Sequence, residues 1–282
     1  MVDALSEPVA ALLDEAARAR AHVMILTGAG ISAESGVPTF RGAEGYWRVG
    51  SRNYHPQEMA THEAFVEMPD EVWAWYLYRR SVCRAASPNA AHEALVALER
   101  ALGDRFLLVT QNVDGLHLRA GQTLARTYQI HGNIDFMRCA DECADAIDRV
   151  PEAIDREWAK GRAIGDAERA LLQCGRCGGR ARPHVLWFDE TYDEPRYRFE
   201  SSIRAARATS LLVVVGTSGA TNLPMQIGSI VARRGVPILD VNPEENPFTN
   251  LARSTPRGAW LAGAAAKTVP AIVERLAASA LG

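Results

Sequence analysis

An imidazole and a carboxylate stand directly after two short apolar runs of this chain. Asp114 and its neighbours Gln111 and Asn112 follow one run, and His131 follows the other. Because an imidazole has an ordinary pKa of about 6.5, His131 is a candidate general base near pH 7. A lone histidine is more often structural, but the polar side chains at a second strand end favour catalysis. Open α/β sheets bind ligands just beyond their strand ends.

A glycine-rich stretch follows the apolar residues 23–26 and reads TGAGISAESGVPTFR over residues 27–41. Gly28 and Gly30 let the backbone turn sharply and approach a ligand, and the start of a following helix favours a phosphate. Because position 33 is alanine, the spacing is not Gly-x-Gly-x-x-Gly, and a tight structural turn remains an alternative. The tail PTFR adds a rigid proline, an aromatic ring and a guanidinium, which favour a nucleotide-binding loop.

Four of the five cysteines form two close pairs, Cys139 with Cys143 and Cys174 with Cys177. Pairs at this spacing can place four thiolates around one Zn²⁺ ion. Four ligands leave no open position for a catalytic water, so the zinc is expected to be structural. Reduced free cysteines or a redox pair are the alternative. Cys83 stands alone and is interpreted as a packing residue.

Apolar runs predict buried parallel strands, and apolar residues at helical spacing predict helices between them. The predicted strands are residues 23–26, 106–110, 127–130, 211–215 and 236–241. The predicted helices outside the insertions are residues 6–21, 88–102, 195–208, 224–234 and 269–280. This alternation predicts an α/β fold with a doubly wound parallel sheet, similar to a Rossmann domain.

Two insertions interrupt the alternation and are expected to pack together as a small lobe. The first, residues 45–83, is helical, and the second, residues 137–180, carries the cysteine pairs. Residues 1–44, 84–136 and 181–282 then form the large nucleotide-binding domain.

The composition narrows the class of protein. The chain has 282 residues, of which 48% are hydrophobic and 23% charged, as in a soluble globular protein. A formal net charge of -3 and the lack of a basic tract give no support for a nucleic-acid partner. No apolar run approaches the roughly 18 residues of a membrane span, and no signal peptide is recognised. A cytoplasmic protein without a membrane partner is therefore expected.

Three motifs together resemble the sirtuins, the NAD-dependent protein lysine deacylases. They are GAGISAESGVPTFRG after the first strand, QNVDGLH at residues 111–117 and IHGN at residues 130–133. The resemblance runs along nearly the whole chain and includes a zinc ribbon at the place of the cysteine pairs. It implies that His131 is the general base and that Asn112 and Asp114 line the nicotinamide pocket. It also implies NAD contacts at Gly28, Ala29, Gly30, Ile31, Ser32, Phe40, Arg41, Gln111, Val113, Gly216, Thr217, Ser218, Asn242 and Ala265.

The resemblance implies a reaction in which NAD is consumed as a co-substrate. The carbonyl oxygen of an acylated lysine attacks the ribose carbon that bears nicotinamide, and His131 then takes a proton from a ribose hydroxyl. The products are nicotinamide, free lysine and O-acyl-ADP-ribose. An ADP-ribosyltransferase or NAD glycohydrolase would use the same cleavage and is the alternative. A non-catalytic NAD sensor is disfavoured by the intact Asn112, Asp114 and His131.

A Tyr-x-x-Arg motif resembles the desuccinylase and demalonylase branch of the sirtuins. Tyr76 and Arg79 share one helix face and offer a hydroxyl and a guanidinium to a carboxylate. Ala60 matches the small residue that widens the acyl pocket of that branch. The expected preference is for negatively charged acyl groups, with acetyl groups also removed. The other predicted substrate contacts are Val185, Trp187 and Phe188.

Two stretches depart from the usual sirtuin pattern, and both are expected on the substrate side. Residues 188–190 read Phe-Asp-Glu where sirtuins usually read Phe-Gly-Glu. Asp189 therefore adds a charge and removes backbone freedom near the peptide. Residues 219–224 also differ from the expected loop. Neither the peptide preference nor the oligomeric state follows from the sequence.

Overall fold

The computed structural model describes residues 5–37, 47–49 and 52–278 of the chain. Its main sheet has six strands in the order β11-β10-β9-β1-β4-β5, and every neighbouring pair is parallel. The chain fills one side of the central strand β1 first and then crosses to the other side. The strands are β1 (Val23–Thr27), β4 (Phe106–Thr110), β5 (Thr127–Gln129), β9 (Leu211–Val215), β10 (Ile238–Asn242) and β11 (Ala259–Ala262). The predicted doubly wound parallel sheet is confirmed.

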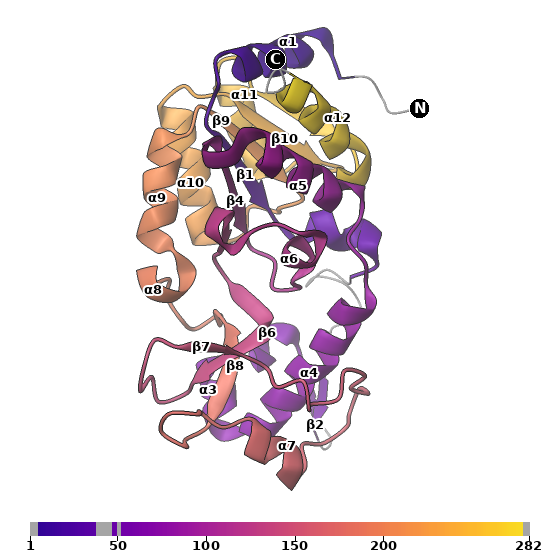
Figure 1. Ribbon diagram of the computed structural model, residues 1–282, viewed down its shortest axis with the longest axis vertical. Coiled ribbons are helices and arrows are strands. Elements are labelled where there is room, and N and C mark those ends of the chain that lie inside the picture. The colour runs from indigo at the N-terminus through magenta and orange to yellow at the C-terminus, as the bar shows by residue number, and fades with distance from the viewer. Residues whose placement is uncertain (1–4, 38–46, 50–51, 279–282) are drawn as a thin grey trace.

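Helices cover both faces of this sheet, which explains why its central strands are almost continuously apolar. In β1, Ile25 packs into the core beneath α1 (Glu7–Arg18), α5 (Ala90–Leu102) and α12 (Ala265–Ala278). Met24 and Leu26 point to the opposite core, beneath α9 (Phe199–Ala208), α10 (Asn222–Arg233) and α11 (Pro247–Ser254). Figure 1 shows the two helical layers on either side of the sheet in the upper half of the molecule.

The two insertions form a second lobe below the sheet (Figure 1). A three-stranded antiparallel sheet has the order β7-β6-β8, with β6 (Gly132–Cys139), β7 (Ile147–Arg149) and β8 (Ala181–Val185). Trp73 of the helical insertion and Trp158 of the cysteine-bearing insertion belong to one buried cluster. The insertions therefore pack together as predicted. The other elements of this lobe are the hairpin β2 (Trp47–Val49) and β3 (Arg52–Tyr54), and α2 (Pro56–Met59), α3 (His62–Glu67), α4 (Pro69–Ala85) and α7 (Asp166–Leu171).

The small sheet includes residues that the predicted boundaries assign to the large domain. β6 begins at Gly132, and Cys139 of β6 is in register with Ala181 of β8. Strand β8 thus pairs in the small lobe and not with the main sheet. Three short elements remain in the large lobe. Along the chain, η2 (Gly103–Arg105) directly precedes β4, and α6 (Leu116–Ala120) and η3 (Leu124–Arg126) connect β4 to β5.

Three helix predictions need correction. The stretch predicted as one helix over residues 195–208 is split into α8 (Glu194–Tyr197) and α9, because Arg198 adopts a left-handed conformation with φ of 55°. The last helix begins at Ala265 instead of residue 269. Near this start the Ala266 N–H donates to the Glu34 carboxylate at 2.6 Å. The glycine-rich loop leads into a 3-10 helix, η1 (Ala29–Ser35), and not into an α-helix.

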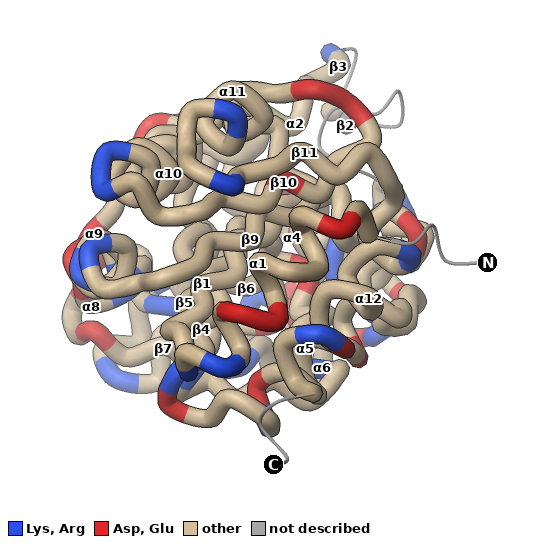
Figure 2. The backbone as a smooth tube through the Cα atoms, turned by 90° about the horizontal axis from the view of Figure 1, so that it is seen from above, with Lys and Arg blue, Asp and Glu red and all other residues tan. Residues whose placement is uncertain are grey.

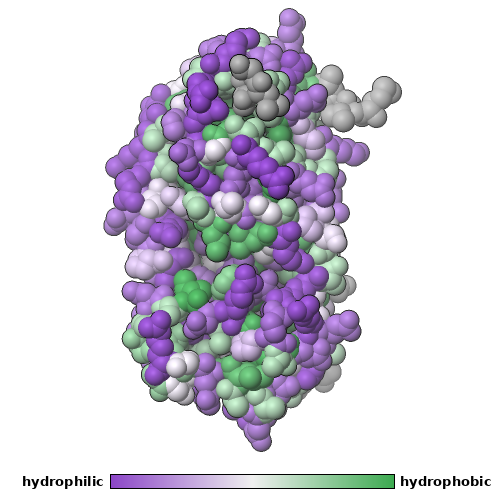
Figure 3. Space-filling model, in the orientation of Figure 1, coloured by the Kyte–Doolittle hydropathy of each residue, from purple (hydrophilic) through white to green (hydrophobic). Residues whose placement is uncertain are grey.

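The surface is mixed in charge and polarity. In Figure 2, residues of both charge signs lie near one another around the periphery of the molecule. Figure 3 shows apolar residues gathered in the middle of one face, at the level where the two lobes join. Within the described ranges, no helix has both the length and the apolar character needed to cross a membrane.

Candidate active site

The glycine loops after β1 and β9 touch each other where the strand order reverses. The Gly30 N–H donates to the Gly216 carbonyl at 2.8 Å, and the Gly28 N–H donates to the Val215 carbonyl at 2.9 Å. A Cβ atom on Gly30 would lie only 2.6 Å from the Gly216 Cα, so this approach requires glycine. The predicted nucleotide loop therefore lies at the switch point, where open α/β sheets bind ligands.

The predicted nicotinamide-pocket residues converge on one hydroxyl from the glycine loop. Ser32 Oγ donates to the Asp114 carboxylate at 2.7 Å and accepts from Asn112 Nδ2 at 3.1 Å. The other carboxylate oxygen of Asp114 accepts from the Leu116 N–H at 2.9 Å. Burial raises the pKa of Asp114, while the bonds from Leu116 and Ser32 lower it. Three side chains from two strand ends are thereby fixed in one buried cluster.

Gln111 joins the ends of β4 and β9. Its Nε2 donates to Thr217 Oγ1 at 2.8 Å, and its Oε1 accepts from Thr221 Oγ1 at 2.9 Å. Ser218 is exposed beside the buried Thr217. Thr221 belongs to the loop that departs from the expected sirtuin pattern, and the sequence did not indicate this contact. Gln111, a predicted NAD contact, is therefore held by both of its amide atoms.

His131 lies between the two lobes with both ring nitrogens bonded. Nδ1 is 3.0 Å from the Gln111 carbonyl oxygen, and since a carbonyl only accepts, Nδ1 carries the proton. Nε2 then accepts from the Tyr192 hydroxyl at 2.8 Å. Burial lowers the pKa of His131 to about 4, and the bond to Gln111 acts in the opposite direction. The neutral imidazole presents Nε2 as its basic atom.

The backbone around His131 is fixed by the small sheet. Gly132 has φ of +80°, and a Cβ there would lie 2.1 Å from the His184 carbonyl oxygen, so glycine is required. The Leu186 N–H donates to the His131 carbonyl at 3.0 Å. The backbone of the candidate base is therefore hydrogen-bonded to the predicted substrate segment, residues 185–190.

Tyr192 is a neighbour of His131 that sequence reasoning missed. Its ring lies 5.8 Å from the His131 ring between centroids, and burial raises the pKa of its hydroxyl to about 12. The hydroxyl therefore keeps its proton at neutral pH and acts as a donor. No local pattern indicates this contact, because 61 positions separate the two residues.

The remaining predicted NAD contacts lie along the same sheet edge or outside the described residues. Asn242 ends β10, and its Nδ2 donates to the buried Asp240 carboxylate, a support that the sequence did not indicate. Ala265 is the buried first residue of α12. Val113 packs into the core of the small lobe. Ala29 and Ile31 belong to η1, and Phe40 and Arg41 lie outside the described residues.

The predicted acyl-pocket residues gather in the small lobe. Tyr76 is buried, and its hydroxyl accepts from Trp187 Nε1 at 3.0 Å. Burial raises the pKa of Tyr76, and the nearby charge of Arg79 opposes this. Arg79 also lies over the Trp75 ring at 5.3 Å. Of the other predicted contacts, Ala60 and Val185 are buried and Phe188 is 61% exposed.

The four paired cysteines form one cluster. Their Sγ atoms all lie within 4.8 Å of one another. The distances Cys139–Cys177 and Cys143–Cys174 are both 3.6 Å between sulfurs. Four thiolates at bonds of about 2.3 Å around a tetrahedral Zn²⁺ have similar separations. The donor set therefore fits a closed zinc site. Cys83 is buried in α4, apart from the cluster, as predicted.

Comparison with known proteins points to one family. The Sir2 family model matches residues 28–222 of this chain. An NAD-dependent protein deacylase of Thermus thermophilus is 41% identical over 256 residues, which cover 90% of either chain. An NAD-dependent protein deacylase of Leptospira interrogans (serovar Lai) is 39% identical over 228 residues, covering 81% of this chain and 84% of the relative.

A solved structure agrees with these relatives. A mutant Sir2 homologue in complex with 2′-O-acetyl-ADP-ribose has a TM-score of 0.76 and 32% identity to this chain, with 96% of each chain covered. Fold, family model and relatives coincide over most of the sequence. The chain is a member of the Sir2 family, the sirtuins.

Proposed function

We propose that this protein is an NAD-dependent protein lysine deacylase. The supporting observation is the convergence of Ser32, Asn112, Asp114 and His131 on the switch-point edge of the sheet. The relatives' names and the acetyl-ADP-ribose bound to a homologue point to the same reaction. The glycine loops then hold NAD, and the substrate is an acylated lysine of a protein.

The chain's residues divide the work in this proposal. Bound NAD supplies the ribose carbon that receives the acyl oxygen and the nicotinamide that leaves. Asn112 and Asp114 hold the nicotinamide side of the pocket. His131 Nε2 takes the proton of a ribose hydroxyl, since Nδ1 is occupied by the Gln111 carbonyl. The four cysteines hold a structural zinc that takes no part in the chemistry.

We further propose that negatively charged acyl groups are preferred and that acetyl groups are also removed. The Tyr76 hydroxyl accepts from Trp187, which leaves its own proton free to point toward a ligand carboxylate. Tyr76 and Arg79 are three positions apart on α4, so they lie on one face of that helix. A hydroxyl donor and a guanidinium suit a carboxylate better than a methyl group.

The Arg79→Met variant tests this preference. Activity on succinyl-lysine peptide should fall by about 10- to 150-fold in kcat/KM, the effect of one charge-assisted bond, with acetyl-lysine activity nearly unchanged. Arg79→Lys, which keeps the charge but loses the planar fork, should fall less. An equal loss on both peptides, or no succinyl-lysine activity in the wild type, contradicts the preference. Nicotinamide release without any deacylation would instead support an ADP-ribosyltransferase or glycohydrolase.

A further inference from the structure

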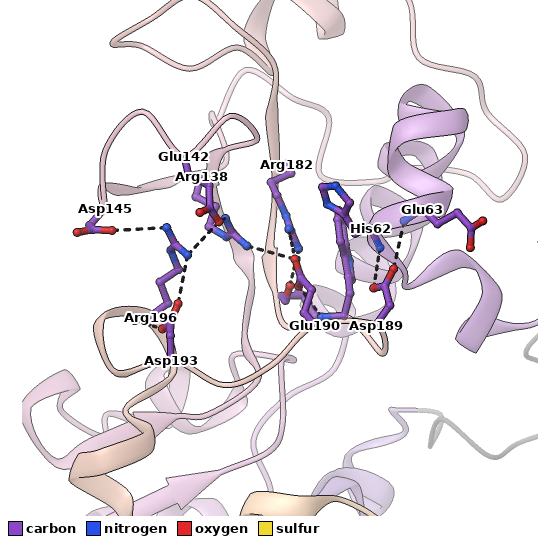
Figure 4. A network of polar contacts seen from close by, with 12 residues as sticks. His62, Glu63, Arg138, Glu142, Asp145, Arg182, Asp189, Glu190, Asp193 and Arg196 are labelled. Carbon is purple, nitrogen blue, oxygen red and sulfur yellow. Dashed lines mark hydrogen bonds and ion pairs between the residues drawn. The ribbon is translucent and has the colours of Figure 1, made fainter.

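The predicted substrate segment is joined to the helical insertion by three consecutive hydrogen bonds. The Phe188 N–H donates to the Ala60 carbonyl at 2.9 Å. The two carboxylate oxygens of Asp189 accept from the backbone N–H groups of His62 at 2.8 Å and Glu63 at 3.2 Å. Figure 4 shows the Asp189 side chain pointing at the backbone between these two residues. The Asp189 carboxylate, which the sequence analysis expected near the peptide, is therefore directed at helix α3 of the protein itself.

Helix α3 has only six residues, and Asp189 accepts from the first two N–H groups of the helix. The N–H groups of a first helical turn have no partner within the helix. Thr61, the N-cap, provides acceptors for Ala64 and Phe65, at 3.1 Å and 3.2 Å. Asp189 provides both acceptors for the two preceding N–H groups. The start of α3 is thus completed by a residue 127 positions away.

The neighbouring carboxylate holds the segment on its other side. Glu190 pairs with the guanidinium of Arg182, which is 2% exposed, and accepts from the Trp187 N–H at 2.9 Å. Arg138 of the small sheet lies 3.5 Å away from the same carboxylate. In Figure 4 Asp189 and Glu190 point in opposite directions, one to the helical insertion and one to the arginines. Two consecutive acids therefore fix residues 187–189 between two elements.

We propose that Asp189 is a positioning residue for the acylated lysine. It holds the Phe188 backbone against Ala60 and so sets the width of the acyl pocket at its mouth. The assignment of the acyl pocket rests on the proposed function. The clamp, by which we mean the bonds of Asp189 to the His62 and Glu63 N–H groups, rests on the observed hydrogen bonds alone. A glycine at position 189 would make neither bond to α3.

Two variants of Asp189 separate positioning from general stability. Asp189→Ala removes both acceptors, and Asp189→Asn keeps one oxygen but places an NH₂ group against an N–H donor. Asp189→Ala should raise the KM and the Kd of an acetyl-lysine peptide by about 5- to 30-fold, less than a direct charge-assisted bond to the peptide would give, because Asp189 acts only through the Phe188 backbone. Its kcat and its KM for NAD should stay within about twofold. Asp189→Asn should lie between this variant and the wild type.

Amide hydrogen exchange reads the clamp without any turnover. Exchange over residues 60–67 should accelerate by about tenfold in Asp189→Ala, because α3 loses the partners of two amides. Asp155→Ala is the matched control, since Asp155 is an exposed carboxylate that accepts from the Glu157 N–H at 3.0 Å within the other insertion. It should change neither exchange over residues 60–67 nor peptide affinity.

The outcomes are distinct. Faster exchange over residues 60–67 together with weaker peptide binding supports the proposal. Unchanged exchange shows that the clamp does not form, and faster exchange with unchanged peptide affinity shows that it positions nothing; either result overturns the proposal. A fall in kcat together with a rise in the KM of both the peptide and NAD would show a general structural role instead, and would overturn the proposal. Failure of the wild type to deacylate any peptide contradicts the proposed function. In that case, amide exchange and the peptide Kd still show whether Asp189 holds α3 and positions the peptide.

Discussion

The orientation of one imidazole determines what the proposed site can do. The Nδ1–H of His131 donates to the Gln111 carbonyl, and the Tyr192 hydroxyl donates to Nε2. Because burial lowers the pKa of His131 to about 4, the ring is neutral at pH 7 and Nε2 is available as a base once its donor is displaced. Asn112 and Asp114, by contrast, are hydrogen-bonded to Ser32 and not to the imidazole in the bonds described above.

Replacing His131 by alanine tests its role as base. The variant should lose deacylation by at least about 10²–10⁴-fold, the usual contribution of a general base, while NAD still binds within a few-fold. Turnover and NAD titration calorimetry measure the two effects separately. Near-normal turnover would remove His131 from this role, and loss of NAD binding would assign it to the cofactor pocket instead.

The four-cysteine cluster, whose geometry fits a zinc ion, lies between two strands of the small sheet. The first cysteine pair ends β6 and its following turn, and the second pair precedes β8. Glu142, next to Cys143, pairs with Arg138 and with Arg196, which lies in α8 of the large lobe, both at 3.0 Å. This chain of charges is visible in Figure 4. A metal at the cysteines would thus order contacts between the lobes.

Removing one thiolate should therefore unfold the small lobe. We expect about one zinc per wild-type chain and, for Cys174→Ser, loss of zinc and of the lobe's cooperative unfolding, because metal binding contributes folding energy. Cys83→Ala, which removes a buried thiol outside the cluster, should keep its zinc. Metal analysis and thermal unfolding measure both properties. A zinc-free wild type with full stability and activity refutes the structural metal.

Local patterns predicted the aliphatic strands well and the irregular elements poorly. The run at 211–215 is a strand as expected, since all five residues are buried. Strand β8 has the unlikely sequence Ala-Arg-Pro-His-Val, and yet all five residues are buried. The reason is tertiary: Arg182 pairs with Glu190, and the His184 ring stacks on Tyr197. Such partners, like Asp189 for α3, are distant in sequence and leave no periodic signal.

At the scale of the whole molecule, the fold buries several neutral histidines in both lobes. Burial lowers the pKa of each of them, to about 4 for His92 and His131, to about 3 for His184, and well below its ordinary value for His117. An unfolded histidine has a pKa of about 6.5. Between about pH 6.5 and pH 4 the unfolded chain therefore binds more protons than the folded chain.

Stability should accordingly be lost as the pH falls through this range. Each such histidine lowers the free energy of unfolding by up to about 1.4 kcal/mol per pH unit below pH 6.5. Urea denaturation at pH 7, 6 and 5 measures the slope. His92→Gln should reduce it by about one histidine's share. A free energy of unfolding that stays constant from pH 7 to pH 5 contradicts this prediction.

The proposed function requires that the glycine-loop edge of the main sheet holds NAD and that the small lobe holds the acyl group. Whether they act together is decided by the products formed from NAD and an acylated peptide. Mass spectrometry should find nicotinamide, deacylated peptide and O-acyl-ADP-ribose in equal amounts, with none of them formed by His131→Ala at a comparable rate. Deacylation that proceeds without NAD, or NAD cleavage that never yields O-acyl-ADP-ribose, would contradict the proposed function.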